Sequence, residues 1–160
     1  MHTTSPDPTD PAIPEDAAQA AAVTVAVAGA IRDSFARQGM MTTMGASIEM
    51  IAPGRVVLSL PITGTVSQKH GFAHAGASFA LGDSAAGYAA LSLMPEGGEV
   101  LTVEMKINLI APAAGVRLIA EGEVVKSGRR LTVVRATIHA EDAAGTRKIS
   151  AILQGTMIPV

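Results

Sequence analysis

The sequence predicts an α+β domain in which one antiparallel β-sheet packs against one long helix. Six segments carry strand signals, and short turns separate most of them, as is typical of antiparallel neighbours. Between the second and third segments, residues 68–94 pass from a polar loop into a helical stretch of mostly small residues. An antiparallel sheet packed against one such helix is typical of the α+β class.

The helix expected within residues 68–94 has the composition of a buried central helix. Its alanines favour helix strongly, and no proline interrupts it before Pro95. Gly82 and Gly87 each weaken it by about 1 kcal/mol relative to alanine. Small residues make sense where other elements approach the backbone closely on several sides. One acid, Asp83, lies in the middle.

The other elements lie on either side of this helix. Residues 1–14 hold four prolines among Asp, Thr and Ser, which predicts a disordered tail. Residues 15–160 are expected to form one domain: an amphipathic helix at 15–39, starting at Glu15 or Asp16 and stopping at Gly39, and a core at 40–160. Strands are expected at 46–51, 55–62, 99–110, 116–126, 130–141 and 149–158.

The segment 99–110 has the clearest strand pattern in the chain. Its apolar residues alternate strictly with polar ones, which predicts a single apolar face. That face would hold Leu101, Val103, Met105, Ile107 and Leu109, and the other would hold Thr102, Glu104, Lys106 and Asn108.

Composition excludes several classes of function. Apolar residues make up 48% of the chain, charged residues 16% and aromatic residues 2%, with a net charge of −2. This balance gives no reason to expect a nucleic acid or a membrane surface as partner, and it suggests that surface is buried against other subunits. The absence of cysteine excludes disulfides and thiolate chemistry. No apolar run is long enough to span a membrane and no signal peptide is recognisable, so we expect a cytoplasmic protein.

A loop with glycine and histidine precedes the central helix. This stretch resembles the Asn-x-x-Gly-x-x-His-Gly-Gly loop of the PaaI-type (phenylacetyl-CoA) thioesterases, which have the hot-dog fold and carry an acid nine residues after the histidine. All spacings hold, although Gln68 replaces the commoner Asn and Ala75 replaces the first Gly of the pair. Residues 102–112 resemble the family's next strand. The matching residues are Gln68, Gly71, His74, Ala75, Gly76 and Asp83.

This resemblance covers about residues 40–158 and implies an acyl-CoA thioesterase. Coenzyme A would be part of the substrate, and no further cofactor is implied. Asp83 would attack the thioester carbonyl or activate a water, Gln68 would hold that water or the thioester, and Thr102 would lie beside the acid. The family implies a homodimer, commonly paired again into a homotetramer. One subunit would supply the loop 68–76 and the other Asp83 and Thr102.

The start of the helix adds a further element of the expected site. The N–H groups of Ala75 and Gly76 lie where unpaired donors and the positive end of the helix dipole coincide, which makes them a natural oxyanion hole. Gly71 belongs to the same loop and is expected to contact the substrate. His74 is either a substrate contact or a structural residue at the helix start.

Each of these residues also has a simpler interpretation. A single acid such as Asp83 is usually solvated, Gln68 would satisfy loop backbone groups, and Thr102 would be an ordinary strand residue. The turn at 126–130 is either a solvated hairpin tip or a contact for the phosphates of coenzyme A through Lys126, Arg129 and Arg130.

The sequence also bears on metal binding and on two rival functions. His2, His70, His74 and His139 do not show convincing zinc spacing, so no metal is expected, and His70 has no assigned role. An enoyl-CoA hydratase would need an Asp-x-x-x-x-His spacing that the central helix lacks. The intact Asp83 argues against an acyl-CoA-binding module without catalysis, while Gln68 and Ala75 leave that alternative open.

Overall fold

A computed structural model describes residues 23–160. The expected tail at 1–14 and the expected helix start at Glu15 or Asp16 lie outside this range. The helices are α1 (Val25–Ala36), α2 (Gly39–Met44) and α3 (Ala75–Leu91). The strands are β1 (Ser47–Ala52), β2 (Arg55–Pro61), β3 (Val100–Leu109), β4 (Arg117–Ser127), β5 (Thr132–Glu141) and β6 (Arg147–Pro159).

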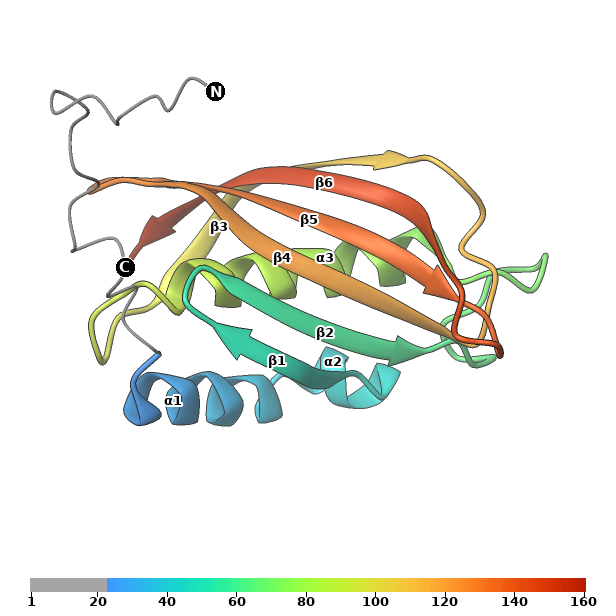
Figure 1. The fold of residues 1–160 in the computed structure, drawn as a ribbon, viewed down its shortest axis with the longest axis horizontal. Coiled ribbons are helices and arrows are strands. Elements are labelled where there is room, and N and C mark those ends of the chain that lie inside the picture. The colour runs from blue at the N-terminus through green and yellow to red at the C-terminus, as the bar shows by residue number, and fades with distance from the viewer. Residues whose placement is uncertain (1–22) are drawn as a thin grey trace, which may run out of the picture.

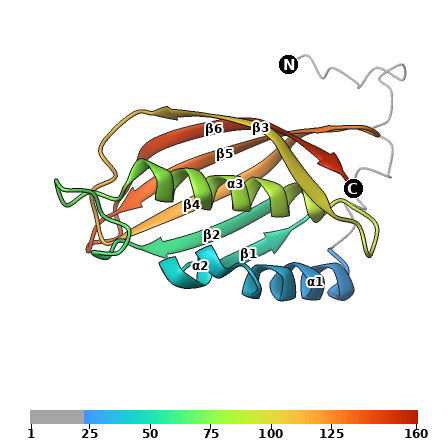
Figure 2. The same cartoon turned by 180° about the vertical axis from the view of Figure 1, so that it is seen from behind.

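The sheet has six strands in the order β1-β2-β4-β5-β6-β3, with every neighbouring pair antiparallel, and it curves around α3 (Figures 1 and 2). The α+β class is confirmed. Sequence neighbours are not always sheet neighbours, however. A short connection joins β3 to β4, yet β4 lies between β2 and β5 while β3 forms the opposite edge from β1.

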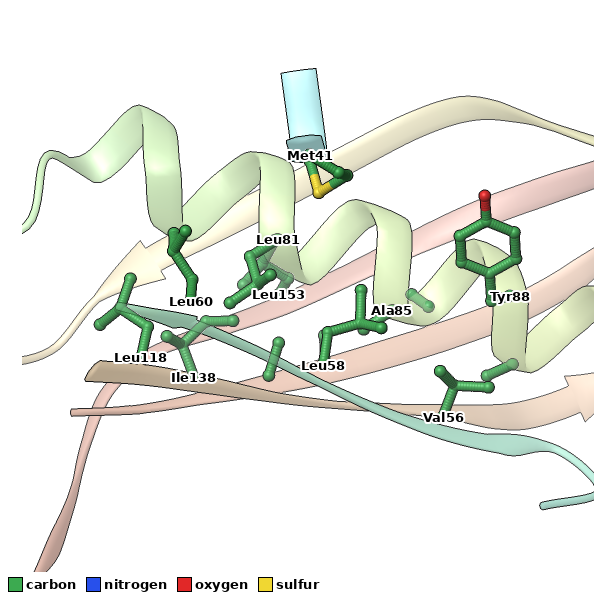
Figure 3. Close-up of a cluster of buried hydrophobic side chains, with 14 of the residues drawn as sticks. Met41, Val56, Leu58, Leu60, Leu81, Ala85, Tyr88, Leu118, Ile138 and Leu153 are labelled. Atoms are coloured by element: carbon green, nitrogen blue, oxygen red, sulfur yellow. The ribbon is translucent and has the colours of Figure 1, made fainter. Parts of the chain in front are cut away.

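The small residues of α3 let the sheet approach its backbone. A Cβ added at Gly122 on β4 would lie 2.3 Å from the Ala85 carbonyl carbon, and one added at Gly82 would lie 2.9 Å from Leu153 Cδ2. Large aliphatic side chains of the sheet surround Leu81 and Ala85 (Figure 3). The expected central buried helix is therefore present.

The N-terminal helical region differs from the expected single helix. Val23 and Thr24 are not helical, and α1 begins at Val25 because Thr24 Oγ1 caps it by accepting the N–H of Val27 at 3.2 Å. Extended backbone at Gln38 then separates α1 from α2. Gly39, the expected stop, is the first residue of α2, and Gly45 ends α2 in the left-handed conformation with φ 76°.

A bulge in β3 changes which residues face the core. The pairing register with β6 shifts between Thr102 and Glu104, so the alternation of faces reverses at that point. Met105 and Ile107 pack against the core, as expected, but Leu101 and Val103 are each 57% exposed. The prediction of one continuous apolar face was wrong because sequence alternation does not reveal an extra residue in a ladder.

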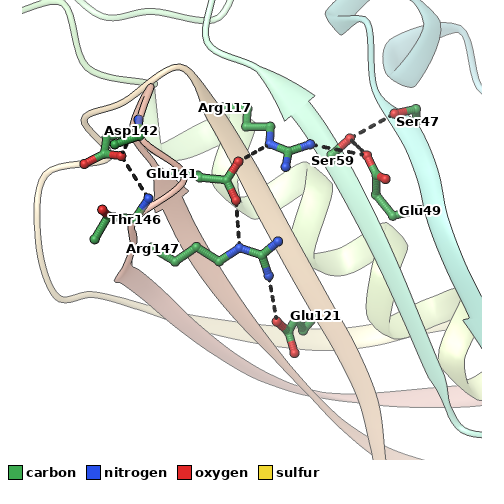
Figure 4. Close-up of polar contacts among 10 residues, drawn as sticks. Ser47, Glu49, Ser59, Arg117, Glu121, Glu141, Asp142, Thr146 and Arg147 are labelled. Carbon is green, nitrogen blue, oxygen red and sulfur yellow. Dashed lines mark hydrogen bonds and ion pairs between the residues drawn. The ribbon is translucent and has the colours of Figure 1, made fainter.

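Ion pairs cover part of the outer face of the sheet (Figure 4). Glu141 accepts from Arg117 Nε at 2.5 Å and from Arg147 Nε at 2.8 Å, and its side chain is 9% exposed. These guanidinium groups, Arg117 first, lower the pKa of Glu141 below its ordinary value. The charges lie on the face of the sheet opposite α3, so they do not contact the residues of that helix.

Candidate active site

Asp83 lies on the part of α3 that faces the start of β3. Its Oδ1 accepts a hydrogen bond from Thr102 Oγ1 at 2.8 Å. The β3 bulge brings this contact about, because it turns Thr102 towards α3. Within residues 23–160 no cationic side chain pairs with Asp83. The half-buried carboxylate therefore keeps an oxygen available for chemistry.

A cavity of about 270 Å³ opens beside Asp83 and Thr102. A chain of polar side chains that sequence reasoning missed also lines it. Gln38 donates from Nε2 to the Tyr88 hydroxyl at 2.8 Å and accepts from Ser84 Oγ at 3.3 Å. Ser34 Oγ lies 3.2 Å from the same hydroxyl.

One residue in the sequence could have pointed to these hydrogen bonds. Tyr88 is the sole tyrosine, and it follows Asp83 by five residues in a helix of small side chains. Its hydroxyl points away from the sheet (Figure 3). Burial raises the pKa of Tyr88, an effect that its hydrogen bonds with Ser34 and Gln38 partly oppose. Tyr88 is therefore a neutral phenol near neutral pH.

His74 caps the start of α3. Its backbone is extended, and Nδ1 accepts the N–H of Gly76 at 2.9 Å. This is the structural role considered for His74, and it leaves the second ring nitrogen as the donor. It also occupies one of the two expected oxyanion donors. The N–H of Ala75, by contrast, has no acceptor among residues 23–160.

Gln68 and Gly71 shape the loop before α3. The Gly71 N–H donates to the Gln68 carbonyl at 2.9 Å, and Gly71 has φ 80°, a conformation that favours glycine. The Gln68 side chain bonds to no other residue of the described chain, and it lines a cavity of about 410 Å³ together with Ala75, Leu109 and Ile110.

The two halves of the expected site do not meet within one chain. Gln68 and Ala75 line one cavity, whereas Asp83 and Thr102 line another. Ala75 and Asp83 are eight residues apart on α3, a rise of about 12 Å. His74 and Gly76 line a third cavity, of about 560 Å³, beside α2.

The basic turn between β4 and β5 lies at the Thr102 end of the sheet. Thr132, at the start of β5, and Thr102 both pair with Met157. Lys126, Arg129 and Arg130 are exposed and form no ion pair within residues 23–160. His70 is exposed in the loop before α3.

The described residues hold neither a cluster of metal ligands nor a membrane-spanning helix. In residues 23–160, no three His, Asp or Glu side chains cluster closely enough to hold a metal ion. None of the helices in that range is long and apolar enough to cross a membrane.

Comparison with known proteins identifies the family. The model of the thioesterase superfamily matches residues 70–145. A thioesterase family protein from Silicibacter pomeroyi has 47% identity and a TM-score of 0.81 over 84% of this chain and 98% of that one. A mutant of a thioesterase from Staphylococcus aureus has 28% identity and a TM-score of 0.68 over 75% of this chain and 97% of that one. A search of curated proteins returned no match.

The hot-dog fold is shared with a further solved structure, the PaaI protein from the phenylacetic acid degradation operon of Escherichia coli. It has 19% identity and a TM-score of 0.75 over 86% of this chain and 96% of that one. The expected hot-dog fold is confirmed, and the likeness to the PaaI protein is one of fold. The chain belongs to the thioesterase superfamily, and its class of activity is thioester hydrolysis.

Proposed function

We propose that this protein is a cytoplasmic acyl-CoA thioesterase in which Asp83 acts as nucleophile or general base, without a cofactor. The observation that carries the proposal is the Asp83 carboxylate itself. It lies beside an open cavity, is oriented by Thr102 at 2.8 Å, and has no cation to neutralise it within the described residues. An acid held ready in this way can attack a thioester carbonyl or take a proton from water.

The active site is proposed to form between two copies of the chain. β3 is an edge strand whose outer side pairs with no strand of residues 23–160, and an open edge of this kind is a template for pairing. An antiparallel two-fold pairing of two β3 edges would place the half of the strand that holds Thr102 beside the half that holds Asn108 in the partner subunit. Asn108 precedes Leu109 and Ile110, which line the cavity of Gln68 and Ala75. Each Asp83 would therefore approach the other subunit's loop.

The remaining roles follow from this arrangement. Ala75 N–H supplies the oxyanion hole, because the Gly76 N–H is taken by His74 Nδ1. Gln68 positions the thioester or the water through its unbonded amide. The exposed cations Lys126, Arg129 and Arg130 contact the phosphates of coenzyme A. Two such dimers assemble into a tetramer, which would cover more of the apolar surface.

The test is release of free thiol from a panel of acyl-CoA thioesters. Turnover should fall at least ~10²-fold in Asp83→Asn, the usual scale for an acid–base group. Gln68→Ala should cost less, because Gln68 positions and does not react, and Thr102→Ala less still. Non-hydrolysable acyl-CoA should still bind to Asp83→Asn. Near-normal turnover by that variant would overturn the proposed role of Asp83. Binding of acyl-CoA without turnover by the native protein would indicate a binding module.

A further inference from the structure

The size and the lining of the cavity beside Asp83 limit which acyl groups can enter it. Its volume of about 270 Å³ lies below the ~300–1,000 Å³ of pockets for drug-sized ligands. A short acyl group would fit it, whereas coenzyme A would not. The reacting carbonyl must come within about 3–3.5 Å of the attacking atom. Because the cavity is too small for coenzyme A, the acyl side of the thioester is the part that enters it.

One end of this cavity is polar. Tyr88, Gln38 and Ser34 meet there through the hydrogen bonds described above, at the contact between α1 and α3. Tyr88 lies about 7.5 Å beyond Asp83 along the axis of α3. Gln38 Nε2 has two hydrogens and bonds one acceptor within residues 23–160, so a donor remains available. A purely apolar acyl end would cover this Gln38 donor without offering it an acceptor.

The charged side chains that line this cavity are both carboxylates, Asp83 and Glu99. A carboxylate at the acyl end would be repelled by them. A neutral hydroxyl or carbonyl would meet donors and acceptors without that repulsion.

We propose that Tyr88, Gln38 and Ser34 form a polar end wall of the acyl pocket that selects short acyl groups bearing a neutral hydrogen-bonding group. This inference rests on the proposed acyl-CoA thioesterase function and adds its substrate class. Ser34 belongs to α1 and Gln38 caps the start of α2, so the N-terminal helical region acts as a determinant of specificity.

The experiment compares kcat/KM within two matched pairs of thioesters: 3-hydroxybutyryl-CoA with butyryl-CoA, and 6-hydroxyhexanoyl-CoA with hexanoyl-CoA. The two acyl chain lengths place the hydroxyl at different distances from the thioester carbonyl, and so at different depths in the cavity. The native protein should prefer the hydroxylated member of at least one pair by about tenfold or more, because a site that hydrogen-bonds a substrate hydroxyl rejects the analogue lacking it. Tyr88→Phe and Ser34→Ala should each move that ratio towards one.

Thr156→Val is the matched control, since it removes a hydroxyl that bonds Glu104 away from the cavity. It should leave the ratio unchanged. Ser34→Ala keeps the test decisive if Tyr88→Phe fails to fold. Hydrolysis of all four thioesters without discrimination, or an unchanged ratio in the folded variants, would overturn the end wall but leave the thioesterase intact. Failure to hydrolyse any acyl-CoA would overturn both proposals.

Discussion

Single atoms decide the chemistry available at the start of α3. His74 Nδ1 takes the N–H of Gly76, and the N–H of Ala75 is left as the unpaired donor at the positive end of the helix dipole. Ala75 occupies the first helical position after the cap. At that position a backbone N–H has no partner inside the helix, so it is free to face a developing oxyanion.

Ala75→Pro should remove this donor while keeping the fold. Proline is favoured at the first helical position, and His74 already has φ −67° and ψ 142°, which suits a residue before proline. Turnover should fall by about 10²–10³-fold, the scale for losing one oxyanion donor. Ala75→Gly, which keeps the N–H, is the control. Equal activity in both variants, with unchanged thermal stability, would exclude the Ala75 N–H as the donor.

At the scale of elements, close backbone contact between α3 and β4 organises the core. Gly122→Ala would push a Cβ to 2.3 Å from a backbone atom of Ala85, and backbone atoms cannot yield as a flexible side chain can. We expect a loss of about 1–3 kcal/mol in the free energy of unfolding, the usual cost of overpacking. Gly64→Ala, where a Cβ meets nothing within 4 Å, should change it little. Denaturant titration of both variants provides the comparison.

The outer face of the sheet predicts a dependence of stability on pH. The pKa of Glu141 is lower in the folded protein than in the unfolded chain, chiefly because of Arg117. Ionised Glu141 therefore stabilises the fold at pH values above its unfolded pKa. This stabilisation is lost as the pH falls through the folded pKa. Glu141→Gln should therefore lower the melting temperature at neutral pH, and the difference should shrink under acid. Glu123→Gln, with its more exposed ion pair to Arg135, should have little effect. A difference that grew in acid would contradict the assignment.

At the scale of the whole molecule, β3 leaves an edge open beside an incomplete site. The protein should therefore not be monomeric at micromolar concentration near neutral pH, which its mass in solution would show. Mixed dimers of two impaired variants provide a sharper test. Chains with Asp83→Asn and chains with Ala75→Pro, unfolded and refolded together, should regain about a quarter of native turnover, because half the dimers are mixed and each has one intact site. No recovery, despite exchange of subunits, would place the site within one chain.

The sequence alone determined the class, the order of the six strands and the central helix, and the motif that resembles the PaaI-type loop. Strand alternation, the small residues of the central helix and the spacing from Gln68 to Asp83 are local, so they can be read without knowing which segments touch. The division of the N-terminal region into α1 and α2 escaped this reading, because the cap at Thr24 and the break at Gln38 compete with the helical pattern that surrounds them.

Only the tertiary structure decided three matters. The bulge in β3 turns Thr102 towards Asp83, and a bulge depends on the partner strand. The polar group around Tyr88 joins residues 34, 38, 84 and 88, a contact across about fifty residues that no local spacing encodes. β3 lies at the edge of the sheet beside β6, although a short connection leads from it to β4. In each case the cause is contact between segments distant in sequence, which residue patterns along the chain do not contain.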